Sequence, residues 1–307
     1  NSWCLLLREY DLTSPFSTHP GLTMRDYILT ISCPDTTGIV YNVSKFLFDQ
    51  QCNILDSAQF GDESTNLFFL RVHFSLPLES QLTEVELQAN FAKVAAPFAM
   101  KYQFFDARVK PRVLLMVSKF GHCLNDLLFR WKSGQLPCEI PAIVSNHQDF
   151  ALLAASYGVP FYHLPVKAEA KELQETQIRQ IIEREKIDLV VLARYMQILS
   201  PELCRDMLGR VINIHHSFLP SFKGAKPYQQ AFDRGVKLIG ATAHYVTSDL
   251  DEGPIIEQDV ARVDHSLTPE ELTARGRDTE CMVLARAVKW HCEHRVVLNG
   301  SKTVVFQ

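Results

Sequence analysis

The sequence lacks the features that would place it among membrane, zinc-ribbon or nucleic-acid-binding proteins. No apolar run reaches the roughly 18 residues that a membrane-spanning helix requires. The eight cysteines form no CxxC pair and match no zinc framework, so no metal site is predicted. The net charge is −4 with both signs interspersed, which leaves no basic face for a phosphate backbone, and no nucleic-acid partner is expected.

What is present is the composition of an ordinary globular protein. The 307 residues are 47% hydrophobic and 21% charged, and this length favours two domains. The cysteines fit reduced, mostly buried thiols, so we expect a cytoplasmic protein. The first well-patterned segment opens at Met24, which makes Met24 a candidate for the biological start, and a loosely docked tail is the favoured alternative for the residues before it. Residues 1–25 are interpreted as an extension, and not as a secretory signal, because no basic region precedes its short apolar stretch.

Residues 26–107 follow the order strand, helix, two strands, helix, strand. Strands are expected at 27–32, 53–60, 67–76 and 98–105, with one helix after Gly38 and another at 82–96. This βαββαβ order predicts a ferredoxin-like domain, in which two helices cover one face of an antiparallel sheet. Residues 110–112 are interpreted as a linker, because proline stiffens it and basic residues keep it hydrated.

Residues 111–307 have a different style, in which apolar strands alternate with helical patterns. This predicts an α/β domain with a doubly wound, mostly parallel sheet, which binds ligands at the carboxyl ends of its strands. Strands are expected at 113–117, 140–144, 161–164, 189–192, 211–214 and 238–246, helices at 171–184, 225–234 and 269–290, and a closing hairpin at 295–298 and 303–306. Four residues of the 171–184 helix are expected to face inward: Leu173, Ile178, Ile181 and Ile182.

The largest concentration of candidate catalytic side chains lies at the end of the strand predicted at 211–214. Asn213 and His215 are two residues apart, so their side chains leave the strand on the same face. The amide can donate to a developing oxyanion, and the imidazole can move a proton. The acidic turn around Asp251 can supply a carboxylate that orients the imidazole. Each residue also has a structural explanation, as a strand-end histidine, a capping asparagine or a turn aspartate, and spacing alone leaves both open.

A longer pattern adds a second line of inference. Asn213-Ile-His215 is followed by Ser217-Phe-Leu-Pro220, Gly224, Gly240-Ala-Thr242-Ala-His244-Tyr-Val246 and Leu250-Asp251-Glu-Gly253-Pro254. This ordered run resembles the signature of the folate-dependent formyltransferase family, and the resemblance covers nearly all of 111–307. It implies that Asn213 is the oxyanion donor, His215 the general acid and base, and Asp251 the carboxylate partner.

The same resemblance implies where a folate binds. The segment that resembles the one packing against the pterin in the family consists of Arg194, Tyr195, Met196, Gln197, Ile198 and Leu199. Thr242 and His244 would line the same pocket, and Val246 and Thr247 would offer backbone groups to the heterocycle. No cofactor is implied, because 10-formyltetrahydrofolate is itself the substrate.

The loop after the first strand of this domain bears on the acceptor. Family members that formylate a ribonucleotide hold its phosphate there, on a glycine- and serine-rich loop. Here the stretch is Ser118-Lys-Phe-Gly-His-Cys123, whose single glycine and bulky phenylalanine form no such nest. We therefore expect hydrolysis of 10-formyltetrahydrofolate to tetrahydrofolate and formate, which supplies formate for purine synthesis and balances the one-carbon pool. Formyl transfer to an amine, and a non-enzymatic amino-acid sensor, are the alternatives.

Residues 26–107 resemble an ACT domain, a small module that binds amino acids at oligomer interfaces. Asp35, Thr36, Thr37 and Gly38 lie in the stretch that resembles its ligand-side loop, where the amides of a helix start can meet a carboxylate. Family members that hydrolyse the formyl group combine such a domain with the formyl-transfer domain. The resemblance implies glycine and methionine as effectors, and an open sheet edge favours a homo-oligomer.

Three other clusters have structural explanations. Cys123 is expected to be a buried thiol at a helix start and not a nucleophile, because no oxyanion site is implied beside it. The run from His291 to His294 is expected to be a solvated helix terminus and not a metal site. The basic stretch 223–226 is too short for a nucleic-acid patch, and it is either an exposed loop or a contact for the glutamate tail of a folate.

Overall fold

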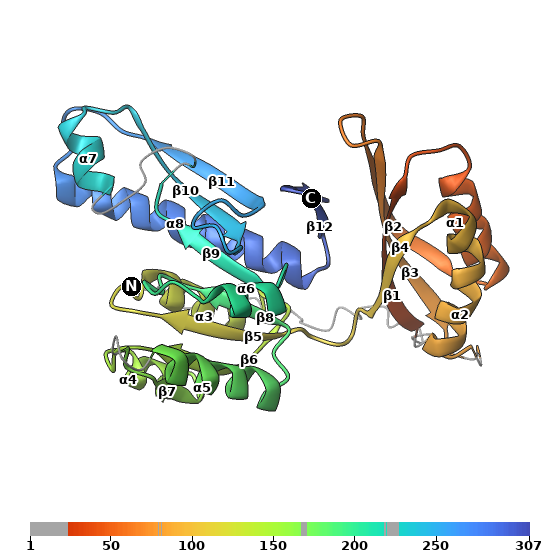
Figure 1. The fold of residues 1–307 in the computed structure, drawn as a ribbon, viewed down its shortest axis with the longest axis horizontal. Helices are drawn as coiled ribbons and strands as arrows, with labels where there is room; N and C mark the ends of the chain where they lie inside the picture. Colours follow the sequence, from red (N-terminus) through yellow and green to blue (C-terminus); the bar gives the residue numbers. More distant parts are fainter. Residues whose placement is uncertain (1–23, 79, 81, 167–170, 218, 220–226) are drawn as a thin grey trace, which may run out of the picture.

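The computed structural model describes residues 24–78, 80, 82–166, 171–217, 219 and 227–307. The extension before Met24 and the basic stretch 223–226 lie outside these residues. Figure 1 shows two sheets well separated in space, a small one near the start of the chain and a larger one carrying most of the helices. In the described part of the chain, no helix combines the length and the apolar character that a membrane crossing demands.

The small sheet confirms the ferredoxin-like prediction. Its elements are β1 (Met24–Pro34), α1 (Ile39–Asp49), β2 (Asn53–Asp62), β3 (Leu67–Pro77), α2 (Glu84–Ala95) and β4 (Lys101–Asp106). The strands pair antiparallel in the order β2-β3-β1-β4, and both helices cover one face (Figure 1). The last strand begins later than predicted, because Ala96–Phe98 forms a short 3-10 helix, η1.

Aromatic packing holds the two helices on this sheet. Phe91 of α2 is fully buried and packs edge-on against Phe46 of α1, with ring centroids 5.1 Å apart. A capping box between Thr83 and Glu86 starts α2. Gly38, with a φ of 92°, precedes α1 in the left-handed conformation that glycine tolerates. These local signals place both helix starts within two residues of the predicted ones.

The larger sheet contains seven strands within the described residues. They are β5 (Arg112–Val117), β6 (Glu139–Ser145), β7 (Phe161–His163), β8 (Leu189–Leu192), β9 (Val211–His215), β10 (Leu238–Tyr245) and β11 (Ile255–Arg262). In the order β11-β10-β9-β8-β5-β6-β7, the strands from β9 to β7 are parallel and the remaining pairs antiparallel. The doubly wound prediction is confirmed, and β11 extends the sheet beyond the predicted strands.

Helices cover both faces of this sheet. On one face lie α3 (His122–Lys132), α4 (Ala151–Ser156) and α8 (Pro269–Cys292), on the other α5 (Lys171–Arg184) and α6 (Pro201–Asp206), and α7 (Pro227–Asp233) packs on α8. Ile178 and Ile181 of α5 are buried as predicted, and Ile182 is partly buried. The prediction for Leu173 is wrong, because this side chain is 69% exposed. Gln174, four residues before Ile178, takes the inward position on that face instead.

The small sheet contacts the rest of the chain around the end of α8. The terminal hairpin, β12 (Val296–Asn299) with β13 (Lys302–Val305), lies between them as Figure 1 shows. Arg71 of β3 donates from Nε to the carbonyl of His294 at 3.1 Å, and the ring of Phe105 stacks on His294 with centroids 3.6 Å apart. The prediction of a solvated terminus at 291–294 is therefore wrong, because the small sheet packs over it.

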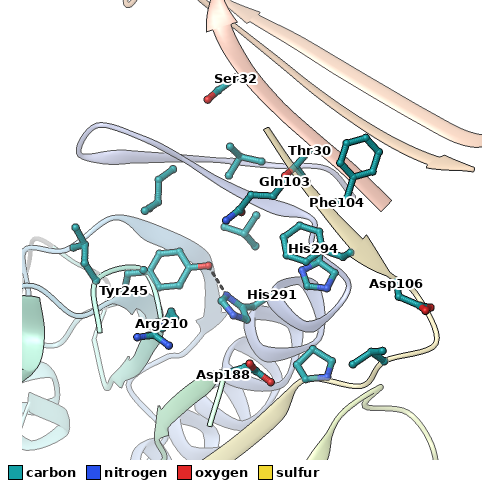
Figure 2. A pocket seen from close by; sticks show the side chains of 18 of the residues that line it. Thr30, Ser32, Gln103, Phe104, Asp106, Asp188, Arg210, Tyr245, His291 and His294 are labelled. Atoms are coloured by element: carbon teal, nitrogen blue, oxygen red, sulfur yellow. Dashed lines mark hydrogen bonds between the residues drawn. The ribbon is translucent and has the colours of Figure 1, made fainter. Parts of the chain in front are cut away.

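A cavity of about 760 Å³ lies at this junction. Figure 2 shows Thr30, Ser32 and Gln103 of the small sheet on one side, and His291 of α8 with His294 just after that helix on the other. His291 is hydrogen-bonded through Nδ1 to the hydroxyl of Tyr245, 2.7 Å away, and burial lowers the pKa of His291 to about 4. The end of α8 is thus tied to β10 of the larger sheet.

The order of the larger sheet reverses at β5. The chain continues from β5 to β6 on one side and returns later to β8 on the other. Ligands of open α/β sheets bind at this switch point, outside the carboxyl ends of the strands. Ser118 follows β5, Arg194 follows β8 and His215 ends β9, so the predicted site residues gather at that edge.

Candidate active site

The last residues of β9 carry two of the predicted catalytic side chains. Asn213 and His215 lie opposite His244 and Thr242 of the antiparallel strand β10. Alternation along β9 sends the side chains of Asn213 and His215 to one face, while Ile212 and Ile214 enter the core. Asn213 is partly buried, and His215 is 6% exposed. The spacing of two residues therefore brings an amide and an imidazole together, as predicted.

The imidazole of His215 contacts the carboxylate of Asp251. His215 Nδ1 lies 3.2 Å from Asp251 Oδ2, so Nδ1–H donates and the lone pair remains on Nε2. Nε2 is buried and has no hydrogen-bond partner among the described residues. The hydrogen bond from His215, with His244 close by, holds the pKa of Asp251 well below its usual range. The carboxylate is therefore ionised and faces a base whose second nitrogen is free.

A tight turn after β10 brings Asp251 to this position. The amide of Tyr245 donates to the carbonyl of Pro254 at 2.9 Å, which closes the turn at its base. A Cβ on Gly253 would lie 1.7 Å from the carbonyl oxygen of Tyr245, so only glycine permits this approach. Asp251 itself has a φ of 57°, a left-handed conformation that costs a non-glycine residue about 1–3 kcal/mol. Such strain persists only where the surroundings fix it, and the contact with His215 does so here.

His244 orients the amide of Asn213. His244 Nδ1–H donates to the carbonyl of Tyr245 at 2.9 Å, which leaves Nε2 as an acceptor. Asn213 Nδ2 donates one N–H to that nitrogen at 3.3 Å. Asp251 Oδ1 approaches the same nitrogen to 3.7 Å. The second N–H of Asn213 remains available to an oxyanion.

These side chains open onto a cavity of about 270 Å³, close to the lower end of ordinary ligand pockets. Its lining includes all three predicted catalytic residues and most of those predicted to bind folate: Arg194, Tyr195, Met196, Gln197, Ile198, Leu199, His244, Val246 and Thr247. Met196 and Ile198 are 55% and 62% exposed, which leaves two apolar side chains available to a planar ring. The structure thus brings the two predicted groups into one cavity.

Thr242 lies behind this cavity and not in its lining. The residue is fully buried, and its hydroxyl donates to the carbonyl of Ser217 at 3.0 Å and accepts from the amide of Leu219 at 3.2 Å. Gln258 of β11 donates to the same hydroxyl at 2.9 Å. Thr242 therefore holds the chain that follows His215, which differs from the predicted role as a pocket residue.

A second polar cluster lies beside the cavity on the α8 side, and of its members only Arg194 was among the predicted site residues. Glu280 is 1% exposed, and its carboxylate accepts from the Tyr228 hydroxyl at 2.5 Å and from His122 Nε2 at 2.7 Å. Arg194 Nε lies 3.5 Å from the same carboxylate. Burial raises the pKa of Glu280, but His122, Arg194 and Tyr228 outweigh it and lower the pKa. The sequence held one signal for this cluster: Glu280 is a charged residue on the face of a long helix that carries mainly apolar residues.

His216 connects the two clusters. Its ring centroid lies 5.3 Å from that of His215 and 6.3 Å from that of Tyr228. Burial, followed by the charge of Arg194, lowers the pKa of His216 to about 4. This imidazole is therefore neutral near pH 7, although it is the immediate neighbour of the predicted base.

The loop after β5 is built for packing. Ser118 Oγ accepts from the amide of Met196 at 3.0 Å, which ties the loop to the chain after β8. Phe120 is 46% exposed, and the guanidinium groups of Arg194 and Arg277 lie over its ring, 5.8 and 5.6 Å from the centroid. A Cβ on Gly121 would lie 2.2 Å from a neighbouring phenyl ring. The one glycine of the loop thus serves side-chain packing.

His122, Cys123 and Glu280 place their ligand atoms within 4.8 Å of one another, a spacing that a metal ion can use. A hydrogen bond with Cys281 and burial raise the pKa of Cys123, so its thiol stays protonated. The cation of Arg194 lies beside the carboxylate. A protonated thiol and a neighbouring cation both disfavour metal binding, and the hydrogen bonds described above account for the cluster.

The loop predicted to bind an amino acid follows β1 and belongs to the lining of neither cavity. All four residues, Asp35 to Gly38, are exposed, and none lines either cavity. The carbonyl of Gly38 accepts from Asn42 Nδ2 at 2.8 Å, and the amide of Asp35 donates to the carbonyl of Asn66 at 3.0 Å. The loop is therefore shaped by its own hydrogen bonds, and its ligand stays a prediction.

Comparison with known proteins places the chain in a family. Residues 111–288 match the formyl transferase family. The formyltetrahydrofolate deformylase of Corynebacterium sp. (strain P-1) is 50% identical over 281 residues, which cover 92% of this chain and 98% of that protein. The chain belongs to the formyltetrahydrofolate deformylase family.

Solved structures distinguish this family from its formyl-transferring relatives. The crystal structure of the formyltetrahydrofolate deformylase from Burkholderia mallei is 53% identical, with a TM-score of 0.87, and covers 92% of this chain and 100% of that one. Glycinamide ribonucleotide transformylase 1 from Symbiobacterium toebii is 29% identical, with a TM-score of 0.60, and covers 64% of this chain and 95% of that one. The deformylase family therefore shares the small sheet as well as the larger one.

Proposed function

We propose that the chain hydrolyses 10-formyltetrahydrofolate to tetrahydrofolate and formate, as a hydrolase acting on a linear amide C–N bond. The observation that carries the proposal is the 3.2 Å contact between His215 Nδ1 and Asp251 Oδ2, which leaves the buried Nε2 free beside Asn213. The family supports the substrate, because the relatives compared above are formyltetrahydrofolate deformylases.

In the proposed reaction the formyl oxygen binds toward the Asn213 amide, and a water binds at His215 Nε2. His215 takes a proton from the water as its oxygen attacks the formyl carbon, and the free N–H of Asn213 donates to the oxyanion. The ionised Asp251 stabilises the imidazolium. His215 then gives the proton to N10, the C–N10 bond breaks, and the formic acid released ionises to formate.

The folate ring lies against the segment from Met196 to Leu199 in this proposal, with the backbone at Val246 and Thr247 facing the heterocycle. The exposed side chains of Met196 and Ile198 at the cavity support this placement. No cofactor or metal is needed, because the chain itself supplies the base, the oxyanion donor and the carboxylate.

Incubating the purified chain with 10-formyltetrahydrofolate and no acceptor tests the reaction. Hydrolysis gives equal amounts of formate and tetrahydrofolate, whereas formyl release only after an amine is added would identify a transferase. Release under neither condition would favour an amino-acid sensor. His215→Ala should abolish release while folate binding, followed by quenching of protein fluorescence, is kept. Full activity of that variant would rule out the mechanism.

The small sheet is the basis of a regulatory proposal. We propose residues 26–107 as an ACT regulatory domain and residues 111–307 as the catalytic domain, with 1–25 as an extension. The strand order β2-β3-β1-β4 supports the ACT assignment. Glycine and methionine are the proposed effectors at Asp35, Thr36, Thr37 and Gly38. Equilibrium dialysis with each labelled amino acid, on the natural chain and on Asp35→Ala, tests both the effector and its site.

We also propose that copies of the chain pair through the small sheet. The edge strand β2 is exposed along most of its length, and Leu55 and Phe60 on it are 49% and 47% exposed. Sedimentation analysis of Phe60→Lys against the natural chain tests this. The proposed setting is the cytoplasm, where the buried free thiols stay reduced and formate supports purine synthesis and the one-carbon pool.

A further inference from the structure

Arg194 is a strained and buried cation at the edge of the catalytic cavity. It follows β8 and is 8% exposed. Its φ of 65° lies in the left-handed region, which a long side chain adopts only where the surroundings fix it. Strain of this kind is concentrated at functional sites. A packing role alone does not require a charged residue in this conformation.

The guanidinium of Arg194 has hydrogen bonds left to make. Its Nε and Nη1 are buried and have no hydrogen-bond partner among the described residues. Glu280 Oε2 is 3.5 Å from Nε, which is an ion pair but too long for a good hydrogen bond. Phe120 offers only the face of its ring. Because buried polar groups are normally hydrogen-bonded, the unmade donors point to a small ligand that accepts hydrogen bonds.

The position of Arg194 indicates that this ligand binds next to the proposed catalytic residues. Leu192 of β8 pairs with Asn213 of β9, so Arg194 stands level with His215, two residues further along. Both residues line the same cavity, together with the neutral His216. The exposed apolar side chains of Met196 and Ile198 follow later in the chain. Arg194 is therefore beside the reacting groups and on the α8 side.

We propose that the guanidinium of Arg194 is the subsite for the carboxylate of product formate, and for the anionic tetrahedral species that precedes it. The proposal rests on the hydrolysis proposed above, in which the formyl amide and water give the amine, formate and one proton. A guanidinium matches the two oxygens of a carboxylate with parallel N–H donors. In this proposal Arg194 binds the oxygens attached to the formyl carbon and does not contact the pterin. This differs from the role that the family resemblance implied.

Glu280 is a positioning residue for this subsite. It is held by Tyr228 and His122 and sits behind the guanidinium at 3.5 Å, so it fixes the orientation of Arg194 and offsets part of its charge. A negative charge at that place weakens the attraction between Arg194 and an anionic product. Removing this charge should therefore tighten formate binding, whereas removing the guanidinium should weaken it.

Inhibition by formate measures both effects. Initial rates of tetrahydrofolate formation at rising formate concentration give an inhibition constant for each variant. We expect Arg194→Lys and Arg194→Gly to raise it by about 10- to 100-fold, the range for a charge-assisted contact, and Glu280→Gln to lower it. Arg277→Lys is the matched control, because Arg277 is exposed, lies over the same Phe120 ring and lies outside the cavity lining. Its inhibition constant should not move.

If the lysine variant folds poorly, the glycine variant can be measured instead, because glycine readily adopts the φ of 65° found at Arg194. Millimolar guanidinium ion should restore formate binding to Arg194→Gly, a rescue that a purely structural role does not predict. Formate inhibition that is unchanged in both Arg194 variants would overturn the proposal. Line broadening of ¹³C-formate in nuclear magnetic resonance measures binding without turnover. It tests the subsite even if the chain hydrolyses no 10-formyltetrahydrofolate, and absent broadening with the natural chain would also overturn it.

Discussion

Replacing Asp251 by asparagine isolates the charge of the proposed relay. The side chain keeps its shape, but the negative charge 3.2 Å from His215 Nδ1 is lost. An ion pair at about 4 Å is worth about 4 kcal/mol at an effective dielectric constant of about 20. This energy is available only when the imidazole becomes protonated during the reaction, so we expect kcat to fall by about 10³-fold. KM should change little, because Asp251 acts on the transition state.

The assay is the initial rate of formate release as a function of substrate concentration and pH. The carboxylate is ionised throughout the neutral range, since its pKa lies well below its usual value. The natural chain should therefore show no activity limb that belongs to Asp251 between pH 5 and 9. Glu252→Gln is the control, because Glu252 is an exposed acid in the same turn and lies outside the cavity lining. A kcat of Asp251→Asn within about threefold of the natural value would refute the reasoning.

Three further outcomes test other parts of the structure. Asn213→Ala removes one oxyanion donor and should lower kcat by about 10²–10³-fold in the formate assay, and a loss confined to KM would contradict that role. Gly253→Ala forces a Cβ to within 1.7 Å of a backbone carbonyl, so it should lower kcat nearly as much as Asp251→Asn while the melting temperature falls by only a few degrees. Burial lowers the pKa of His216, His291 and His294 from 6.5 to about 4, so the unfolded chain binds more protons below pH 6.5, and stability is lost as the pH falls toward 4. The melting temperature in calorimetry should be lower at pH 5 than at pH 7, and equal values would contradict the burial of these rings.

The fold could be predicted from the sequence wherever the local pattern of a segment and its packing in the folded chain favour the same structure. The near-continuous apolar strands of the parallel sheet and the βαββαβ order at the front each have a single favourable packing. β11 escaped prediction because the polar stretch from Glu257 to Asp259 interrupts its apolar residues, so Ile255–Arg262 shows no apolar run. Leu173 was misplaced because its helix face is set by Gln174, a polar residue that packs inward through hydrogen bonds to Tyr195 and to a backbone carbonyl.

The site was predictable only in part, because some of its residues are neighbours in the sequence and others come from distant elements. Asn213 and His215 share a face of one strand, so spacing alone predicts that they converge. The approach of Asp251 depends on the length of β10 and on a turn that Gly253 permits, so the residues alone left it open and the family resemblance favoured it. The cluster around Glu280 joins α3, α7, α8 and the end of β8. No periodicity in the sequence reports contacts among four separate elements.

The two carboxylates beside the cavity explain how the proposed product can leave. Asp251 and Glu280 are both ionised, whereas Arg194 is the one cation in contact with either of them among the described residues. His216 adds no charge near neutral pH, because burial and Arg194 keep it deprotonated. Formate formed here can accept hydrogen bonds from the unpaired donors of Arg194. The two carboxylates and the one guanidinium nevertheless give the site a net negative charge. The donors hold the anion while the C–N10 bond breaks, and the net negative charge favours its departure afterward, so formate should bind far more weakly than the folate.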